Sequence, residues 1–145
     1  MISRKAALLV AAVVAVAGVL GGCAMYGKSS SRQEDRFVRP GVARVSPSGG
    51  FTAYAEPGPP QNGVATWVVV VWDGSNAEVY RDSYAYSTRH GVGITWLSNA
   101  DQLWVLSSDV GDAHVDRKPD GTWVKTAITP ETINDIPEEI RILGE

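Results

Sequence analysis

Few side chains in this sequence can do chemistry at neutral pH: there are one cysteine, Cys23, and two histidines, His90 and His114. A histidine exchanges protons near neutral pH, so His90 with Asp109 or Asp112 has the makings of a general base or a polar ligand contact. The sequence contains no Gly-x-Ser-x-Gly elbow that would supply a nucleophile. A loop histidine that hydrogen-bonds a backbone carbonyl is therefore the simpler interpretation of His90.

The second histidine lies between two carboxylates. Asp112, His114 and Asp116 occupy alternate positions, so they share one face if the segment is a strand. Carboxylates and imidazole bind divalent metals, but same-face side chains stand about 6.8 Å apart along a strand. Three of them converge on one ion only where a bulge bends the backbone. We therefore expect a solvent-facing edge strand, whose charges discourage aggregation, and keep these residues as weak metal-ligand candidates.

Aromatic side chains supply the other candidate contacts. Tyr86 and Trp96 flank His90 in the sequence, and we regard them as candidate ligand contacts together with it. The tryptophans are expected to be core residues first, because each buries a large apolar area. They are Trp67, Trp72, Trp96, Trp104 and Trp123. Two of them exposed together would instead form a platform for a carbohydrate or a protein.

The N-terminus has the composition of a processing signal. Arg4 and Lys5 precede an uninterrupted apolar run from Ala6 to Leu20, and the run ends in Leu20-Gly21-Gly22-Cys23. Such a run is as long as the apolar core of a signal peptide can be, and it is shorter than the roughly 20 residues that span a bilayer. The alternatives are an uncleaved N-terminal helix with a buried free cysteine and a secretory signal with an incidental cysteine.

An aliphatic residue, two small residues and a cysteine in this register resemble the lipobox of bacterial lipoproteins. The resemblance implies cleavage between Gly22 and Cys23 and attachment of a diacylglycerol to the Cys23 thiol. Two or more long acyl chains anchor a protein stably, because each buried methylene contributes about 0.8 kcal/mol. We therefore expect a lipid-anchored protein on the extracytoplasmic face of the cell membrane, or of the outer membrane in a two-membrane cell.

Composition and charge limit the classes of protein and of binding partner that fit this sequence. A chain of 145 residues suits one domain, and 44% hydrophobic with 20% charged residues is a globular composition. Without residues 1–22 the net charge falls from −3 to −5, since 11 basic and 16 acidic residues remain, and this argues against a nucleic-acid partner. One cysteine forms no internal disulfide. The sequence has no phosphate loop, nucleotide fingerprint or zinc-ligand spacing, so we expect no cofactor.

The chain beyond the signal divides into three parts: residues 23–36 carry Cys23 and a flexible tether, residues 37–128 an all-β domain, and residues 129–145 a tail. Two segments, Ala65–Trp72 and Gln102–Ser107, are apolar on both faces and predict central, buried strands. About eight short antiparallel strands are expected, at Ala43–Ser46, Phe51–Glu56, Ala65–Trp72, Ala77–Arg81, Val92–Leu97, Gln102–Ser107, Asp112–Arg117 and Thr122–Ala127.

The tail has helix-start chemistry at two places. Thr129 is placed to cap a helix that has Pro130 at its first position, and Pro137 marks a second start. The isoleucines of the tail are expected to pack one short helical face on the sheet; they are Ile133, Ile136, Ile140 and Ile142, followed by Leu143. A solvated tail is the alternative.

The two halves of the strand region repeat with a period of roughly 44–50 residues. Val45–Ala53 parallels Thr95–Val105, each running through a strand, a polar turn and another strand. This pattern resembles two blades of TolB-type and WD40-like β-propellers, which implies two four-stranded units. Propellers have four or more blades. The two units are therefore expected to remain blade-like or to pack face to face as a β-sandwich, unless several chains associate.

The function that these expectations favour is a non-catalytic binding or interaction module at the cell envelope, held to the membrane by lipid on Cys23. Its partner would be an envelope protein or a wall polymer. One alternative is an envelope enzyme or enzyme accessory that uses His90 with a nearby aspartate. The other is a structural envelope protein whose repeats self-associate.

Overall fold

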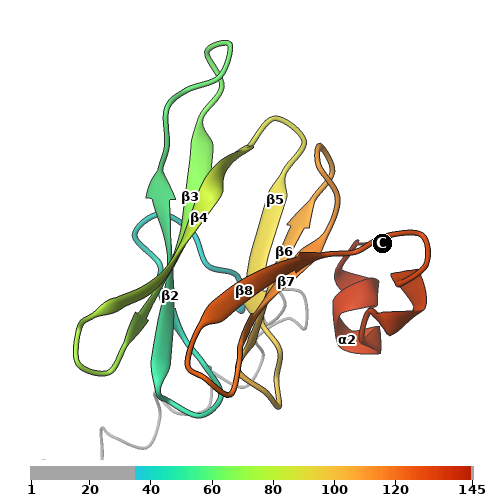
Figure 1. The fold of residues 1–145 in the computed structure, drawn as a ribbon. Helices are drawn as coiled ribbons and strands as arrows, with labels where there is room; N and C mark the ends of the chain where they lie inside the picture. The colour runs from blue at the N-terminus through green and yellow to red at the C-terminus, as the bar shows by residue number, and fades with distance from the viewer. Residues whose placement is uncertain (1–34, 145) are drawn as a thin grey trace, which may run out of the picture. The chain divides into compact units, whose positions relative to one another are not determined.

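The structure is a computed structural model that describes residues 35–144. The expected signal peptide, the Gly22–Cys23 cleavage position and most of the tether lie outside the described residues. The described chain is mostly β and forms two separate four-stranded antiparallel sheets (Figure 1). Sheet 1 has the order β1-β2-β3-β4 and sheet 2 the order β5-β6-β7-β8. The strands are β1 (Arg44–Val45), β2 (Phe51–Pro57), β3 (Thr66–Asp73), β4 (Glu78–Ser87), β5 (Val92–Trp96), β6 (Gln102–Ser107), β7 (Ala113–Arg117) and β8 (Trp123–Ala127).

The all-β prediction is confirmed, and β4 shows the largest difference from the predicted strands. It was expected over Ala77–Arg81, whereas it continues to Ser87. The continuation begins with Asp82-Ser83, two polar residues that interrupt the apolar pattern. The structure buries Asp82 nevertheless, because other side chains bind its carboxylate, and the pairing of β4 with β3 is irregular at two places in this strand.

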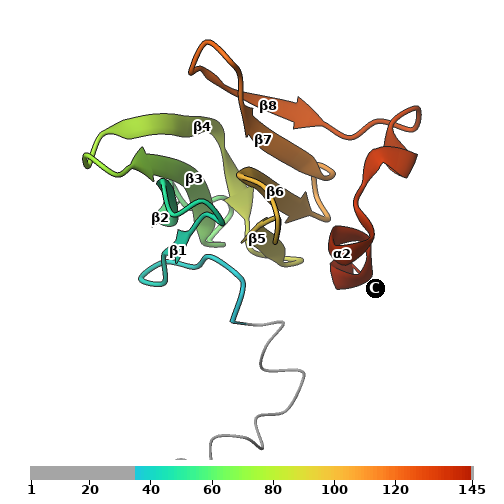
Figure 2. The same ribbon diagram turned by 90° about the horizontal axis from the view of Figure 1, so that it is seen from below.

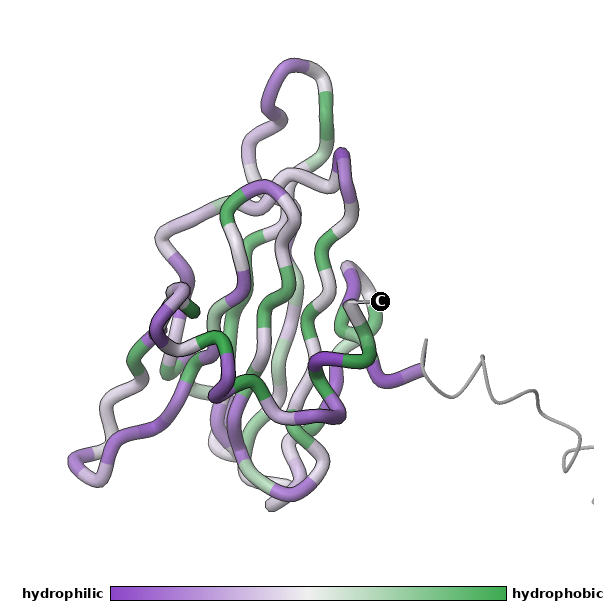
Figure 3. The backbone as a smooth tube through the Cα atoms, turned by 90° about the vertical axis from the view of Figure 1, so that its right-hand side faces the viewer, coloured by the Kyte–Doolittle hydropathy of each residue, from purple (hydrophilic) through white to green (hydrophobic). Residues whose placement is uncertain are grey.

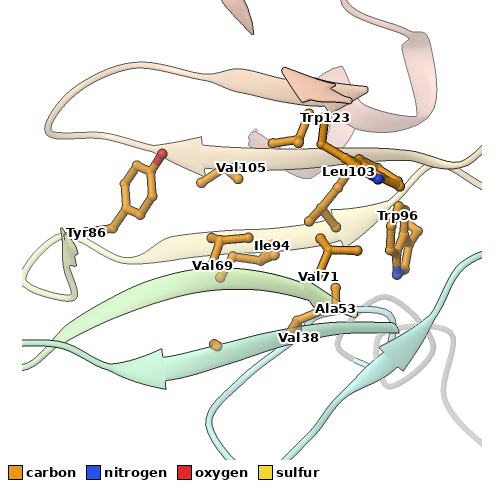
Figure 4. Packing of buried hydrophobic residues seen from close by; sticks show 12 residues of the cluster. Val38, Ala53, Val69, Val71, Tyr86, Ile94, Trp96, Leu103, Val105 and Trp123 are labelled. Carbon is orange, nitrogen blue, oxygen red and sulfur yellow. The ribbon is translucent and has the colours of Figure 1, made fainter. Parts of the chain in front are cut away.

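The inner faces of the two sheets share one hydrophobic core. Ala53 and Ala55 are buried while Tyr54 between them is 40% exposed, so the alternation predicted for β2 is confirmed. The cluster draws on both sheets, as Figure 4 shows; it contains Val38, Ala53, Ala55, Val69, Val71, Tyr86, Ile94, Trp96, Leu103, Val105, Val115 and Trp123. Each large aliphatic side chain buried there contributes about 1.5–3 kcal/mol, so this core holds sheet 1 on sheet 2.

The central strands β3 and β6 are buried on both faces, as predicted. Val69 and Val71 point into the core, and Val70 between them is also fully buried. In β6, Trp104 lies between two core residues and is only 1% exposed on the opposite face. Figure 3 shows the same pattern along the backbone, with hydrophobic residues recurring in the strands and hydrophilic residues at many of the turns.

Polar contacts join equivalent parts of the two sheets. The Trp96 indole of β5 donates a hydrogen bond to the Arg44 carbonyl of β1, at 2.8 Å. The turn after β1 binds the turn after β5, because the Ser48 hydroxyl donates to Asp101 at 2.5 Å. Burial alone would raise the pKa of Asp101, but the hydrogen bonds from Ser48 hold it below its usual value.

The C-terminal tail contains short helical turns in place of one helix: η2 (Ile133–Asp135), α2 (Glu138–Arg141) and η3 (Ile142–Gly144). The helix start predicted at Thr129 is a turn, in which the Thr132 N–H donates to the Thr129 carbonyl at 3.0 Å. The start predicted at Pro137 is confirmed, because α2 begins at the next residue.

The predicted stripe of tail isoleucines does not form. Ile140 is 1% exposed, whereas Ile133 is 57% and Ile142 46% exposed. The helical turns are too short to line up several side chains on one face. Figure 2 shows α2 on the side of sheet 2 that faces away from sheet 1. Within residues 35–144, none of these helices has the length and apolar character needed to cross a membrane.

Candidate functional site

The segments that flank the sheets contact the outer face of sheet 2 at β5. The Arg36 guanidinium donates to the Thr95 hydroxyl at 2.9 Å and to the Glu139 carboxylate at 3.2 Å, so it ties β5 to α2. Phe37 lies over Gly93, where a Cβ atom would stand 3.0 Å from the phenyl ring. The glycine therefore leaves the space that the ring occupies.

A groove of about 1120 Å³ remains between this covered face and the tail. Such a volume is slightly larger than that of typical ligand-binding clefts, roughly 300–1,000 Å³. Its walls come from the chain before β1, from β5 and β6, and from the tail. The side chains that concern the predicted site are His90 and Asp112, and the apolar ones include Phe37, Val92, Leu106, Ile128, Ile136, Ile140 and Leu143.

The structure brings His90 near both aspartates that were considered with it. The His90 side chain is 61% exposed, and its Nε2 atom stands 3.9 Å from Asp109 Oδ1. Asp112 lines the same groove, where burial raises the pKa of its carboxyl group although the Ser107 N–H donates to it. Among the hydrogen bonds of the described residues, none joins His90 to a serine or threonine hydroxyl. The groove therefore brings together His90 and Asp112, two side chains that can exchange protons.

The other two candidate ligand contacts lie in the core between the sheets. Trp96 is 6% exposed and its indole N–H is bonded to Arg44 of β1. Tyr86 is 2% exposed, and its hydroxyl donates to Asp82 Oδ2 at 2.7 Å. Neither side chain lines the groove that contains His90, so their role as ligand contacts stays a prediction.

Tyr86 belongs to a buried polar cluster that sequence reasoning missed. The Lys125 ammonium of β8 donates to Asp82 at 2.9 Å and to the Tyr86 hydroxyl at 3.1 Å. Burial, and then the Asp82 carboxylate, raise the pKa of the Tyr80 and Tyr86 hydroxyls, which therefore stay protonated. The cluster fastens β4 to β8. Forty-three positions separate Asp82 from Lys125, and no local pattern relates them.

The alternating residues of β7 form a different arrangement from the one a metal site needs. His114 Nδ1 is hydrogen-bonded to Asp116, whose other oxygen accepts a 2.6 Å bond from the Gln102 amide. Gln102 in turn accepts the indole N–H of Trp104 at 2.8 Å. Asp112 is bonded elsewhere, to Ser107. Within residues 35–144, no group of three or more histidine, cysteine or acidic side chains is arranged to hold a metal ion.

Among the described residues, the most exposed edge-to-face pair of aromatic rings lies on the outer face of sheet 1. Tyr54 of β2 and Trp72 of β3 contact edge to face, with ring centroids 6.3 Å apart and planes at 67°. Beside them, Arg81 of β4 makes ion pairs with Glu56 at 2.9 Å and Glu78 at 2.6 Å. The sequence suggested that an exposed tryptophan pair would form a platform; the structure instead pairs one tryptophan with a tyrosine.

This surface, together with the groove, is the strongest candidate for molecular recognition in the described chain. The two places differ in chemistry: the groove is apolar with acid–base groups at its edge, and the face of sheet 1 combines aromatic rings with ion-paired side chains. Comparisons with protein-family models, with curated proteins and with solved structures find no match to this chain.

Proposed function

We propose that the protein is a lipid-anchored, extracytoplasmic lipoprotein that acts as a non-catalytic binding module at the cell envelope. The observation that carries the proposal is the register of Leu20-Gly21-Gly22-Cys23 with the preceding charges and apolar run. The only cysteine of the chain falls where the lipobox resemblance requires it. The tether expected at residues 23–36 then links the lipid to the sheets.

The architecture proposed for the module is a pair of blade-like units. Equivalent strands of the two sheets contact each other: β1 meets β5 through Arg44 and Trp96, and β4 meets β8 through Asp82 and Lys125. Equivalent turns also meet, through Ser48 and Asp101. This correspondence supports two repeats related as neighbouring propeller blades, with one shared core.

An enzyme or enzyme accessory is the second candidate, and the groove is the observation that favours it. His90 and Asp112 line the same groove, and a buried carboxyl group with a raised pKa is a frequent component of acid–base sites. A 3.9 Å separation between His90 and Asp109 is, however, longer than a hydrogen bond. The binding module therefore remains the preferred proposal.

The anchor is tested by Cys23→Ala in the native host, followed by separation of membranes from soluble protein. We expect the wild type in the membrane fraction and the variant either in the soluble fraction or as the unprocessed precursor. Ala24→Ser, which leaves the cysteine in place, is the matched control and should stay in the membrane fraction. A soluble wild type whose Cys23 is unmodified by mass spectrometry would contradict the anchor.

A further inference from the structure

Exposed aliphatic side chains adjoin the groove on sheet 2. Val110 is 52% exposed and lies in the turn between β6 and β7, in which Ser108 and Gly111 line the groove. Ile133 is 57% exposed and lines the groove itself, and Ile142, which is 46% exposed, lies between two residues that line it. We call Val110, Ile133 and Ile142 the aliphatic rim. Exposed apolar side chains that adjoin an apolar groove mark an interaction site, unlike single scattered ones.

The interior of the groove is aliphatic as well. Leucine, isoleucine and valine supply most of its apolar side chains, and Phe37 is the one aromatic ring among the described residues that line it. Partner proteins are usually held by tryptophan, tyrosine and arginine in small pockets. An acyl chain has no polar group to satisfy, and each of its methylenes gains free energy when it leaves water. The lining therefore fits a hydrocarbon chain better than a protein surface.

The edge of sheet 2 beside the groove is not free to bind an extended peptide. A peptide that joins a sheet needs unpaired backbone groups on the edge strand. β5 is an edge strand of sheet 2, but its Ile94 carbonyl already accepts the Val38 N–H at 2.8 Å. The Trp96 carbonyl of the same strand accepts the Arg36 guanidinium at 2.9 Å. The addition of another strand is therefore blocked at both residues.

The described chain enters the domain at this groove. Phe37 lines it, and Arg36 beside it is bonded to Thr95 and Glu139. Cys23 lies 14 positions before Phe37, and a peptide spans at most about 3.6 Å per residue, so Cys23 lies within about 50 Å of the groove. Tethering raises the effective concentration of whatever is held at the other end of the tether. A bilayer is thus the occupant that the proposed anchor itself brings to this face.

Charges near the groove are arranged in opposite pairs. Arg36 pairs with Glu139, and Arg141 pairs with Glu138. Paired charges lose less than isolated ones when they approach hydrocarbon. The chain without residues 1–22 carries −5, so an anionic membrane does not attract it by charge. Contact with lipid therefore depends on the aliphatic rim and the tether, and it needs no anionic headgroup.

We propose that the groove and its aliphatic rim contact the bilayer that holds the Cys23 anchor, with acyl chains of its lipids against Val110, Ile133 and Ile142. This rests on the proposed lipid anchor and names the surface by which the domain lies on its membrane. The contact is non-covalent. Because α2 lies on the side of sheet 2 that faces away from sheet 1, it turns the outer face of sheet 1 away from the bilayer (Figure 2).

The test places one fluorescent label at a time on the full-length protein in phosphatidylcholine vesicles. Ile133→Cys, Ile142→Cys and Val45→Cys each add one thiol to a chain whose only cysteine is at the expected acylation site. Val45, on β1 of sheet 1, is 60% exposed and serves as the matched control. A nitroxide on the lipid acyl chains should quench the labels at positions 133 and 142 several-fold more than the label at position 45. Iodide in the water should quench them in the opposite order.

A second pair of variants tests the rim itself. In the protein labelled at position 133, Val110→Asp should reduce quenching by the lipid nitroxide, and Val45→Asp should leave it unchanged. Both side chains are exposed, so neither substitution should affect the fold. Equal quenching by the lipid nitroxide at all three labelled positions overturns the proposal. Iodide quenching at positions 133 and 142 that matches the quenching at position 45 overturns it too.

The number of labels per molecule, read by mass spectrometry, reports the anchor separately. A lipidated Cys23 has no free thiol, so one label is expected. Two labels mean that Cys23 is unmodified, and they overturn this inference together with the anchor on which it rests. One label with a rim that stays in water overturns the lipid contact alone and leaves the lipoprotein assignment in place.

Discussion

The outer faces of the two sheets differ in what covers them, although each carries a tryptophan on a central strand. On sheet 2, Trp104 is 1% exposed and its indole N–H is bonded to Gln102. On sheet 1, Trp72 is only half-buried and lies beside the exposed Tyr54. Flanking segments of the chain contact sheet 2 at β5, whereas within residues 35–144 no such contact is seen on the outer face of sheet 1.

The difference separates a face that contacts the rest of the chain from a face that is open within residues 35–144. Arg36 and Phe37 lie on the outer face of sheet 2 at β5, and Arg36 joins this strand to Glu139 of the tail. Continued blade-on-blade association would have to displace Ile140 and the Arg36–Glu139 ion pair. The self-associating structural protein expected as an alternative therefore meets a steric obstacle at these contacts.

Replacing the outward-facing tryptophan of each sheet by alanine should lower the free energy of unfolding more on sheet 2 than on sheet 1. Trp104→Ala removes a fully buried side chain and is expected to lower the free energy of unfolding by about 3–5 kcal/mol. Trp72→Ala, on the open face, should cost less than half as much, because part of its ring already contacts water. Urea unfolding followed by circular dichroism measures both. Equal losses would mean that the two faces are equally buried in solution.

The tail offers a second pair of variants for the same comparison. Ile140→Ala leaves a cavity where α2 meets the domain and should cost about 2–5 kcal/mol. Ile133→Ala, at a side chain that is 57% exposed, should change stability by less than about 0.5 kcal/mol. Unfolding curves for both variants report the result. An Ile140→Ala variant as stable as the wild type would show that the packing of the tail does not stabilise the domain.

Most strands could be predicted because the pattern of apolar and polar residues within each segment is enough to indicate them. Alternation in Phe51–Glu56 and the two-faced run Gln102–Ser107 depend only on neighbouring residues, and both strands form as expected. The predicted strand Ala77–Arg81 ends one residue before Asp82, whereas β4 continues to Ser87. The burial of Asp82 in this strand depends on Lys125, and a contact over that sequence distance depends on how the sheets pack.

The candidate sites were harder to predict for the same reason. Alternation placed His114 and Asp116 on one face. It could not show that the Gln102 amide of the neighbouring strand would donate a hydrogen bond to the Asp116 carboxylate. Tyr54 and Trp72 likewise have the spacing of an outward face, yet nothing in their own segments states whether another part of the chain covers them. The exposure of a face follows from the course of the tail, which the local pattern does not contain.

A small, pH-dependent effect is expected at the ion pair between Arg36 and Glu139. Burial alone would raise the pKa of Glu139, but hydrogen bonds from Ser98 and the Arg36 charge hold it below the usual value of 4.5. A carboxyl group whose folded-state pKa is lowered contributes stability above its unfolded pKa, and this contribution disappears as the pH falls through the folded-state value. Glu139→Gln should therefore be less stable than the wild type near neutral pH, by about 1 kcal/mol or less for so exposed a pair, and the difference should vanish well below pH 4.5.

Unfolding free energies of both proteins across this pH range measure the effect, and Ser98→Ala should show part of it, because it removes the hydroxyl that donates to Glu139 but leaves Arg36 in place. A difference that is independent of pH would show that the carboxylate charge does not fasten the tail. A difference that does vanish in acid links the contact between the tail and sheet 2 to the ionisation of Glu139.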